Sequence, residues 1–254
     1  MPALDWILAA LLVCLASGLQ AATGAGLGLI AGPALILVMG STAAIPVAIV
    51  MNLIVSFALL PKEHKAVDRP ALTWLSIGTV LGIPLGVLVL GLLDLTALKI
   101  VAGLAVLAGA VQVLRGRRRG GARSPSDGGL RHSLGFGLVS GVMSASLAMP
   151  GPAAMCALAR TGQAATVVRA TLRALFVVSY GAALLVHAVM GIRWDHLASV
   201  TLVLLPVVVA GILAGHLAQT RLSERALGNA LTLMLFLMGA SLLGNGLWDM
   251  PFDV

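Results

Sequence analysis

The sequence predicts an all-α membrane protein, a polytopic helical bundle made of two inverted repeats. Three observations lead to this prediction: an excess of apolar residues, a series of long apolar runs, and a similarity between the two halves of the chain. Hydrophobic residues make up 59% of the 254 positions and charged residues only 10%, whereas a soluble domain has about 25% charged residues. The chain therefore lacks the polar residues that would cover a water-exposed surface.

Ten apolar segments follow one another, separated by glycines, prolines and clusters of charge. The runs 72–93 and 199–217 reach the roughly 20 residues that a helix needs to cross a bilayer. Because the runs are continuous and lack the two-residue alternation of a barrel strand, each segment is predicted to be a helix. The ten segments are 5–20, 25–39, 43–60, 71–91, 96–114, 132–147, 150–160, 164–190, 197–219 and 226–247.

A polar stretch, 115–131, separates the first five segments from the last five. It is basic, rich in Gly and Ser and poor in apolar residues. This composition predicts a flexible cytoplasmic linker held near anionic lipid headgroups. The linker divides the chain into an N-terminal membrane repeat, 1–114, and a C-terminal membrane repeat, 132–254.

The two halves share an order of small-residue motifs. Gly32-Pro33 corresponds to Gly151-Pro152, and the pattern at 82–86 (Gly-x-x-x-Gly) corresponds to the one at 211–215. The latter two motifs are predicted to be helix-packing faces. Five segments per half is an odd number, so the second copy is predicted to be inverted. The first two segments of each half are short and rich in Gly and Pro, so each half is predicted to have a broken or re-entrant helix pair followed by three spans.

Basic residues fall unevenly on the two sides of this arrangement. With 115–131 in the cytoplasm, 14 of the 16 Lys and Arg residues lie on the cytoplasmic side, and the other two are Lys99 and Arg193. Since cytoplasmic loops of membrane proteins are enriched in Lys and Arg, we predict a multi-pass protein of the cell inner membrane with both termini outside. The same asymmetry explains the net charge of +7, so nucleic acid is not a predicted partner.

The interrupted segments 23–33 and 144–152 are predicted to meet near the bilayer midplane and form a substrate site. Glycines let a helix unwind, and proline suits the first turn of the helix that resumes. A helix N-terminus inside the membrane would bind an anion through its free N–H groups. Close helix packing is the alternative for the first segment, whereas paired interruptions in two repeats favour a transporter site. The candidate binding residues here are Gly28, Gly32, Pro33, Ser144, Ser146 and Gly151.

Arg169 and Arg173 lie four residues apart and share one helix face. Arginine within a span is costly and usually functional, and its planar fork binds two oxygens of an oxyanion. The alternative is that both side chains extend to the cytoplasmic interface. Thr171, between them, and Asn52, in the other half, are candidates for neutral hydrogen bonds to the substrate, or for bonds between helices.

Several kinds of chemistry are not predicted. No Cys, His or Asp cluster has metal-site spacing, and no nucleophile lies beside a base, so we predict no metal, no cofactor, no catalytic residue and no enzyme activity. His187 and His216 are predicted to be hydrogen-bonded structural histidines. All nine carboxylates fall in loops or at segment ends, which disfavours ion coupling through a membrane carboxylate. The sequence does not distinguish a monomer from a homo-oligomer.

Three stretches together resemble the TauE/SafE sulfite exporter family over about residues 5–245. They are the Gly-rich segment ending in Gly32-Pro33, the loop Lys62-Glu-His-Lys-Ala-Val-Asp68, and 151–171, which runs from Gly-Pro to Arg-Ala-Thr. The resemblance implies a transporter of a small sulfur-containing anion, such as sulfite, sulfoacetate or a related organosulfonate, in contact with membrane lipids. Where many members have a Gly-rich run, this chain has Ser and Ala at 144–148, which leaves the particular anion open.

Alternating access, with one half rocking against the other, is the predicted mechanism. Three alternatives stay open at this point. One is an anion channel, which would need a continuous polar pore. The others are an integral-membrane enzyme acting on a lipid or quinone, and an assembly subunit that transports no substrate.

Overall fold

The computed structural model describes residues 3–24, 26–62, 64–118, 130–192 and 194–249. All regular elements in these residues are helices, and each predicted segment forms one, which confirms the helical fold class. The ten α-helices are α1 (Ala3–Thr23), α2 (Leu27–Met39), α3 (Ala44–Leu59), α4 (Arg69–Leu92), α5 (Leu95–Arg118), α6 (Leu130–Leu147), α7 (Gly151–Leu158), α8 (Ala165–Val189), α9 (Trp194–Arg221) and α10 (Glu224–Trp248). Two short 3-10 turns, Leu60–Lys62 and His64–Ala66, lie between α3 and α4.

Capping residues set several of the helix boundaries. Asp68 accepts a hydrogen bond from the N–H of Ala71 and begins α4, and Ser223 does the same for Ala226 at the start of α10. A short side chain in this position satisfies one of the N–H groups that a first helical turn leaves unpaired. At a helix C-terminus, Gly40 ends α2 in the left-handed conformation, with φ 55°.

Six helices are long and apolar enough to cross a membrane: α1, α4, α5, α8, α9 and α10. The helices α2 and α3 are shorter, and α7 has only 8 residues. The prediction that the first segment of each half is short was wrong for α1, which has 21 residues. The reason is that Gly18 does not break this helix; it lies against the carbonyl oxygen of Gly211, where a small residue permits close packing.

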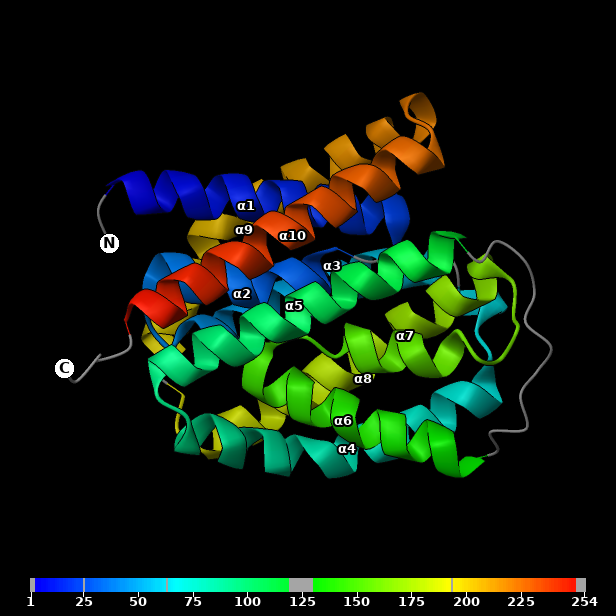
Figure 1. Cartoon of the computed structure of the whole chain (residues 1–254), viewed down its shortest axis with the longest axis horizontal. Coiled ribbons are helices and arrows are strands. Elements are labelled where there is room, and N and C mark those ends of the chain that lie inside the picture. Colours follow the sequence, from blue (N-terminus) through cyan, green and yellow to red (C-terminus); the bar gives the residue numbers. More distant parts are fainter. Residues whose placement is uncertain (1–2, 25, 63, 119–129, 193, 250–254) are drawn as a thin grey trace.

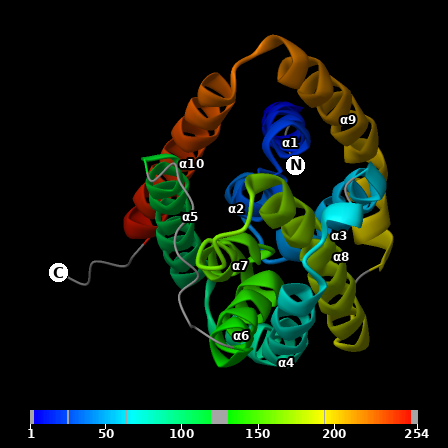
Figure 2. The same ribbon diagram turned by 90° about the vertical axis from the view of Figure 1, so that its right-hand side faces the viewer.

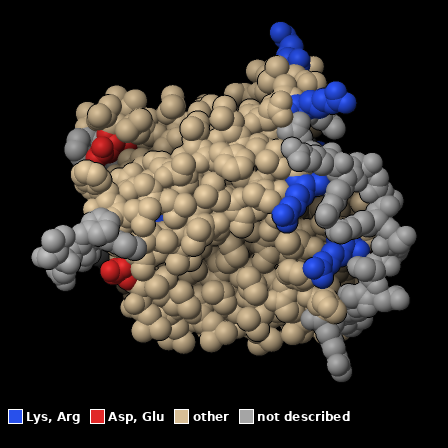
Figure 3. Space-filling view, viewed as in Figure 1, with Lys and Arg blue, Asp and Glu red and all other residues tan. Residues whose placement is uncertain are grey.

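The helices run side by side along one common direction, and α1 begins at the same end of the bundle at which α10 finishes (Figure 1). On the face shown in Figure 3, the Lys and Arg side chains gather at one end of the bundle and the Asp and Glu side chains at the other. Lys99, one of the two basic residues predicted to lie outside, pairs with Asp249 at 2.6 Å near the end of α10. The other, Arg193, and residues 119–129 of the predicted linker lie outside the described residues, whereas the first four linker residues continue α5.

Helix pairing is symmetric between the two halves. The helix α4 packs along α6 and α9 packs along α1, while α5 packs on α10 and α3 on α8. Exchanging α1–α5 with α6–α10 leaves these pairings unchanged. This is the pattern expected of a two-fold repeat, and the inversion of one copy relative to the membrane stays a prediction. In the end-on view of Figure 2, α2 and α7 lie in the middle of the bundle.

Glycines form the two longest helix contacts, as predicted for the Gly-x-x-x-Gly motifs. A Cβ at Gly82 of α4 would overlap the carbonyl oxygen of Leu138 in α6, and one at Gly86 would overlap that of Val142. In the other pair, a Cβ at Gly211 of α9 would overlap atoms of Cys14 and Ser17 in α1. Each contact brings backbone against backbone, a geometry that small residues allow in membranes.

Replacing Gly82 by Ala is therefore expected to lower the stability of the purified protein by about 1–3 kcal/mol, the usual cost of overpacking. The matched control is Gly91→Ala in the same helix, where no atom lies within 4 Å of the added Cβ. Alanine there is expected to leave stability unchanged or raise it by up to about 1 kcal/mol, because glycine is the poorer helix former. Thermal unfolding in detergent compares the two, and equal melting temperatures would contradict the packing role of Gly82.

Candidate functional site

The helix α1 ends at Thr23 and α2 begins at Leu27, and the interruption between them is called the first break. Gly24 adopts a left-handed conformation, φ 82°, and its N–H donates to the carbonyl of Gln20 at 2.9 Å. The left-handed residue ends α1 in the way common at helix C-termini. After the break, Leu27 and Gly28 open α2.

The second break, at residues 148–150, separates α6 from α7. Ala148 is left-handed, φ 55°, and its N–H donates to the carbonyl of Ser144 at 3.0 Å, which is the bond of an αL helix C-cap. The hydroxyl of Tyr180 donates to the carbonyl of Ala148 at 3.2 Å. The break is buried, and non-helical backbone at membrane depth persists only where protein or a cavity surrounds it.

The N-terminal turns of α2 and α7 converge on the ring of Phe176 in α8. The Cβ positions of Gly28 and Gly151 lie 3.5 and 3.6 Å from this ring. A Cβ at Gly32 would overlap the carbonyl oxygen of Leu147, so α2 crosses directly over the second break. Pro33 continues α2 and is buried. The structure thus brings the predicted residues of the two interrupted segments together.

Both predicted arginines lie against the first break. Arg173 is only 4% exposed, and its Nη2 lies 3.4 and 3.5 Å from the carbonyl oxygens of Gln20 and Ala21. These carbonyls belong to the last turn of α1, where a cation is favourable. The side chain of Arg169 packs on Gly24, filling the space that a Cβ there would occupy. Arg173 is therefore buried inside the bundle and is not extended to its surface.

Thr171 and Ser146 use their hydroxyls within the protein. Thr171 Oγ1 donates to the carbonyl of Val167 at 2.8 Å and accepts from the N–H of Asp68 at 3.0 Å. It therefore ties the start of α4 to α8. Ser146 Oγ donates to the carbonyl of Val142 at 2.7 Å. A substrate contact by either residue stays a prediction.

Other polar atoms near the breaks are buried without a hydrogen-bond partner among the residues that the structure describes. They include Gln20 Nε2, Asn52 Oδ1, Ser144 Oγ and Ser179 Oγ. Such groups are uncommon in proteins, and each costs about 1–3 kcal/mol unless a ligand or water satisfies it. Each of these four atoms is free to form a hydrogen bond with a polar ligand, which makes the region around the breaks a candidate site.

Three residues of this region were missed by the sequence analysis: Gln20, Phe176 and Tyr180. Gln20 Oε1 accepts the N–H of Gly28 at 2.9 Å, so the side chain links α1 to the first turn of α2 across the break. Phe176 and Tyr180 lie four residues apart in α8, with ring centroids 5.8 Å apart. Only their rarity in the sequence could have pointed to the aromatic pair: Tyr180 is the single tyrosine of the chain, and aromatic residues make up only 4% of it.

Three of the described carboxylates have partners within the protein. Asp68 caps α4, Asp94 accepts from the N–H of Ala97, and Asp249 pairs with Lys99. Within the part of the chain that the structure describes, no group of three His, Cys, Asp or Glu could hold a metal ion. The charges that the described contacts place at the breaks are positive: they are those of Arg169 and Arg173 and the partial charges of two helix N-termini.

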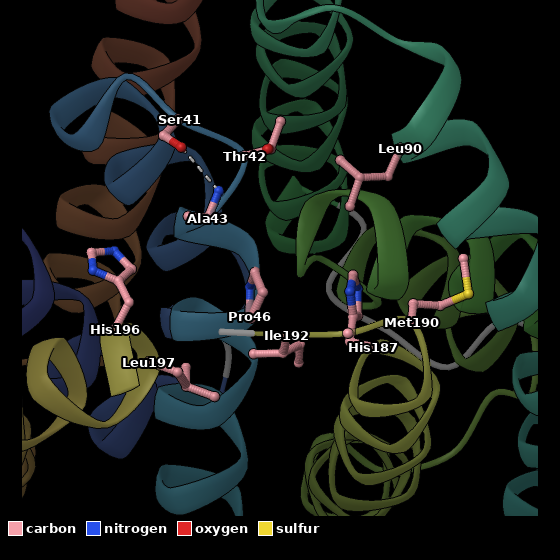
Figure 4. Close-up of a pocket in the computed structure, with 11 residues that line it drawn as sticks. Ser41, Thr42, Ala43, Pro46, Leu90, His187, Met190, Ile192, His196 and Leu197 are labelled. Carbon is pink, nitrogen blue, oxygen red and sulfur yellow. Dashed lines mark hydrogen bonds between the residues drawn. The ribbon is translucent and has the colours of Figure 1, made fainter. Parts of the chain in front are cut away.

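A cavity of about 430 Å³ lies at the end of the bundle where α1 begins. Its lining includes Ser41 and Thr42 from the α2–α3 turn, Leu90 of α4, and His187 and His196 (Figure 4). His187 Nε2 lies 2.9 Å from the carbonyl oxygen of Ala145, which can only accept, so this nitrogen donates. The histidine is hydrogen-bonded, as predicted, and connects the cavity wall to α6 just before the second break.

Comparison with known proteins identified one related group. The family model described as Sulfite exporter TauE/SafE matches residues 9–242. No curated protein and no solved structure matches the chain.

Proposed function

The chain belongs to the TauE/SafE sulfite exporter family, and from this membership we propose that it exports a small sulfur-containing anion across the cell inner membrane by alternating access. The family is one of membrane transporters of sulfur-containing anions, and the six long apolar helices fit a multi-pass protein in contact with lipid. Sulfite, sulfoacetate and related organosulfonates are the proposed substrates. An interior-negative potential would drive each negative charge outward with about 2.3 kcal/mol per 100 mV.

One observation carries the assignment of the site: two broken helices meet N-terminus to N-terminus beside a buried arginine. Gly28 and Gly151 both contact Phe176, and Arg173 lies on the break next to Gly28. Helix N-termini and guanidinium groups both favour oxyanions. We assign Arg173, Arg169 and the N–H groups of these first turns to the anionic head of the substrate.

Close packing at the breaks favours a transporter over a channel. A channel needs a continuous polar path, whereas α2 lies directly on the backbone of Leu147 and the hydroxyl of Tyr180 lies 2.9 Å from the Cβ position of Gly28. Passage of an anion would require these contacts to separate and re-form. Alternating access includes such a step, because one part of the protein moves against the other around the site.

Flux of labelled sulfite, sulfoacetate and sulfate into proteoliposomes tests the proposal. We expect at least one sulfur oxyanion to cross faster than in empty vesicles, and Arg169→Ala to slow it by roughly 10- to 100-fold, because a charged hydrogen bond contributes about 1.5–3 kcal/mol. Arg160→Ala is the control, since Arg160 is an exposed arginine stacked on Phe136. Flux equal to that of empty vesicles for all three anions would refute the proposed function.

We also propose that the end of the bundle bearing the cavity faces outward. In a Cys14→Ala, Cys156→Ala background, an impermeant maleimide added to intact cells is expected to label Thr42→Cys but not Gln163→Cys. Both positions are exposed, one beside the cavity and the other at the opposite end between α7 and α8. The reverse labelling pattern would show that the orientation is wrong.

A further inference from the structure

The amide of Gln20 has a fixed orientation. Its neighbour at 2.9 Å is the backbone N–H of Gly28, which can only donate, so the atom facing it must be the oxygen. The Nε2 group is then turned away from this bond. It is buried, since Gln20 is 0% exposed, and it has no partner among the described residues. The first turn of α2 therefore has an unused amide donor beside it.

The amide of Asn52 is fixed in the opposite sense. Its Nδ2 lies 2.8 Å from the carbonyl oxygen of Ala48, which can only accept, so Oδ1 is the free atom. Asn52 is 0% exposed, and this oxygen has no partner in the part of the chain described. It lies 3.7 Å from the Cβ position of Gly28. The same helical turn therefore has an unused acceptor beside it as well.

Tyr180 adds a second acceptor beside this turn. Its hydroxyl hydrogen is used by the carbonyl of Ala148, at 3.2 Å. The lone pairs of the same oxygen remain, 2.9 Å from the Cβ position of Gly28. An anion whose oxygens carry only lone pairs would be repelled by both acceptors, Asn52 Oδ1 and the Tyr180 oxygen. An anion that also carries a hydroxyl group could donate its hydrogen to one of them.

We infer that the anion bound at the first turn of α2 is a singly protonated sulfur oxyanion, hydrogen sulfite. This rests on the proposed function and makes its substrate more specific. The hydroxyl donates to Asn52 Oδ1, and the unprotonated oxygens accept from Gln20 Nε2 and from the nearby Arg173. The sulfite dianion, sulfate dianion and an alkylsulfonate head offer acceptors alone. They leave Asn52 unpaired, and sites built to bond a substrate hydroxyl discriminate strongly against ligands that lack it.

Sulfite and methanesulfonate are the two probes, because the second is a monoanion with acceptors only. In proteoliposomes we expect hydrogen sulfite to cross at least about tenfold faster than methanesulfonate. In Asn52→Leu, which removes the acceptor, hydrogen sulfite flux is expected to fall about tenfold or more, with methanesulfonate flux unchanged or raised. Asn245→Leu is the matched control, since Asn245 makes the same bond to a carbonyl four residues earlier but is exposed. Parallel loss for both anions, or no loss, would overturn the inference.

A second measurement uses the wild-type protein alone. At constant total sulfite, flux is expected to fall as pH rises, in proportion to the remaining hydrogen sulfite, while methanesulfonate flux stays constant. Methanesulfonate is the control for titration of the protein, because it uses the same site and does not itself change protonation with pH. Its flux would change if one of the titratable groups of α8, the helix packed against α3, changed protonation: Arg169, Arg173, Tyr180 or His187. Sulfite flux that is constant or rising with pH would exclude the protonated substrate. Absence of flux for every sulfur oxyanion in the wild type would instead refute the proposed function.

Discussion

Exchanging Gln20 for Glu is expected to reduce anion transport by about 100-fold or more while the protein stays folded. One carboxylate oxygen can keep the hydrogen bond to the N–H of Gly28. The other replaces the buried donor Nε2 by a negative charge at the place proposed for the anion. Two like charges about 4 Å apart interact by roughly 4 kcal/mol at the effective dielectric of a partly polar site. Anion flux in proteoliposomes measures the loss, and thermal unfolding checks the fold.

Two further variants separate charge from shape. Gln20→Met keeps the length of the side chain without a donor or a charge, so its flux is expected to fall about tenfold, less than that of the Glu variant. Gln219→Glu makes the same chemical change at an exposed position near the end of α9, where flux is expected to stay within about twofold of wild type. Equal flux in Gln20→Glu and wild type would show that no anion binds beside Gln20.

Arg173→Leu is expected to bring transport close to that of empty vesicles and to lower stability as well. The guanidinium is the buried cation at the break and also lies on two carbonyls of the last turn of α1. Its loss would remove charge pairing with the substrate and leave those carbonyls with one partner fewer. The structural part of the effect is expected to be about 1–3 kcal/mol.

Arg173→Lys distinguishes the role of Arg173 in substrate binding from its contacts with the carbonyls of α1. Lysine keeps the charge but not the planar fork, so we expect near-normal thermal stability and a flux reduced by about tenfold. Arg221→Leu is the control, because Arg221 lies in the last turn of α9 and is exposed. Transport at the wild-type rate in Arg173→Leu would remove this residue from the site.

Most of the fold was predictable because membrane crossing constrains it strongly. Each apolar run had to become a helix to satisfy its own backbone, and glycines, prolines and charges marked the ends. The error at α1 has a physical reason. A glycine within an apolar run permits either a break or a close approach, and only the neighbouring helix decides which. Gly24 is at a break, whereas Gly18 contacts α9.

The candidate site was predictable in part. Arg173 and the glycines of the two interrupted segments were candidates because arginine is costly in a membrane and glycines let a helix unwind. The expectation that Pro33 lies in the first turn of the resumed helix was wrong, because α2 already begins at Leu27 and Pro33 lies inside it. Gln20 was not a candidate, since its contact with Gly28 depends on the chain turning back at Gly24 and placing Gly28 beside it. Tyr180 lies 32 residues from its partner Ala148, and no local pattern links the two. Contacts of this kind arise only from tertiary packing.

The backbone contacts of α1 with α9 and of α4 with α6 determine which parts of the molecule can move as rigid bodies. Each contact joins a helix of the first half to a helix of the second, at glycines that leave no side chain between them. If the two halves rocked as units, the helices of both closely packed pairs, α1 with α9 and α4 with α6, would have to slide past one another. Each closely packed pair is composite, with one helix from each repeat. The repeats of the sequence and the closely packed helix pairs of the structure therefore divide the chain differently.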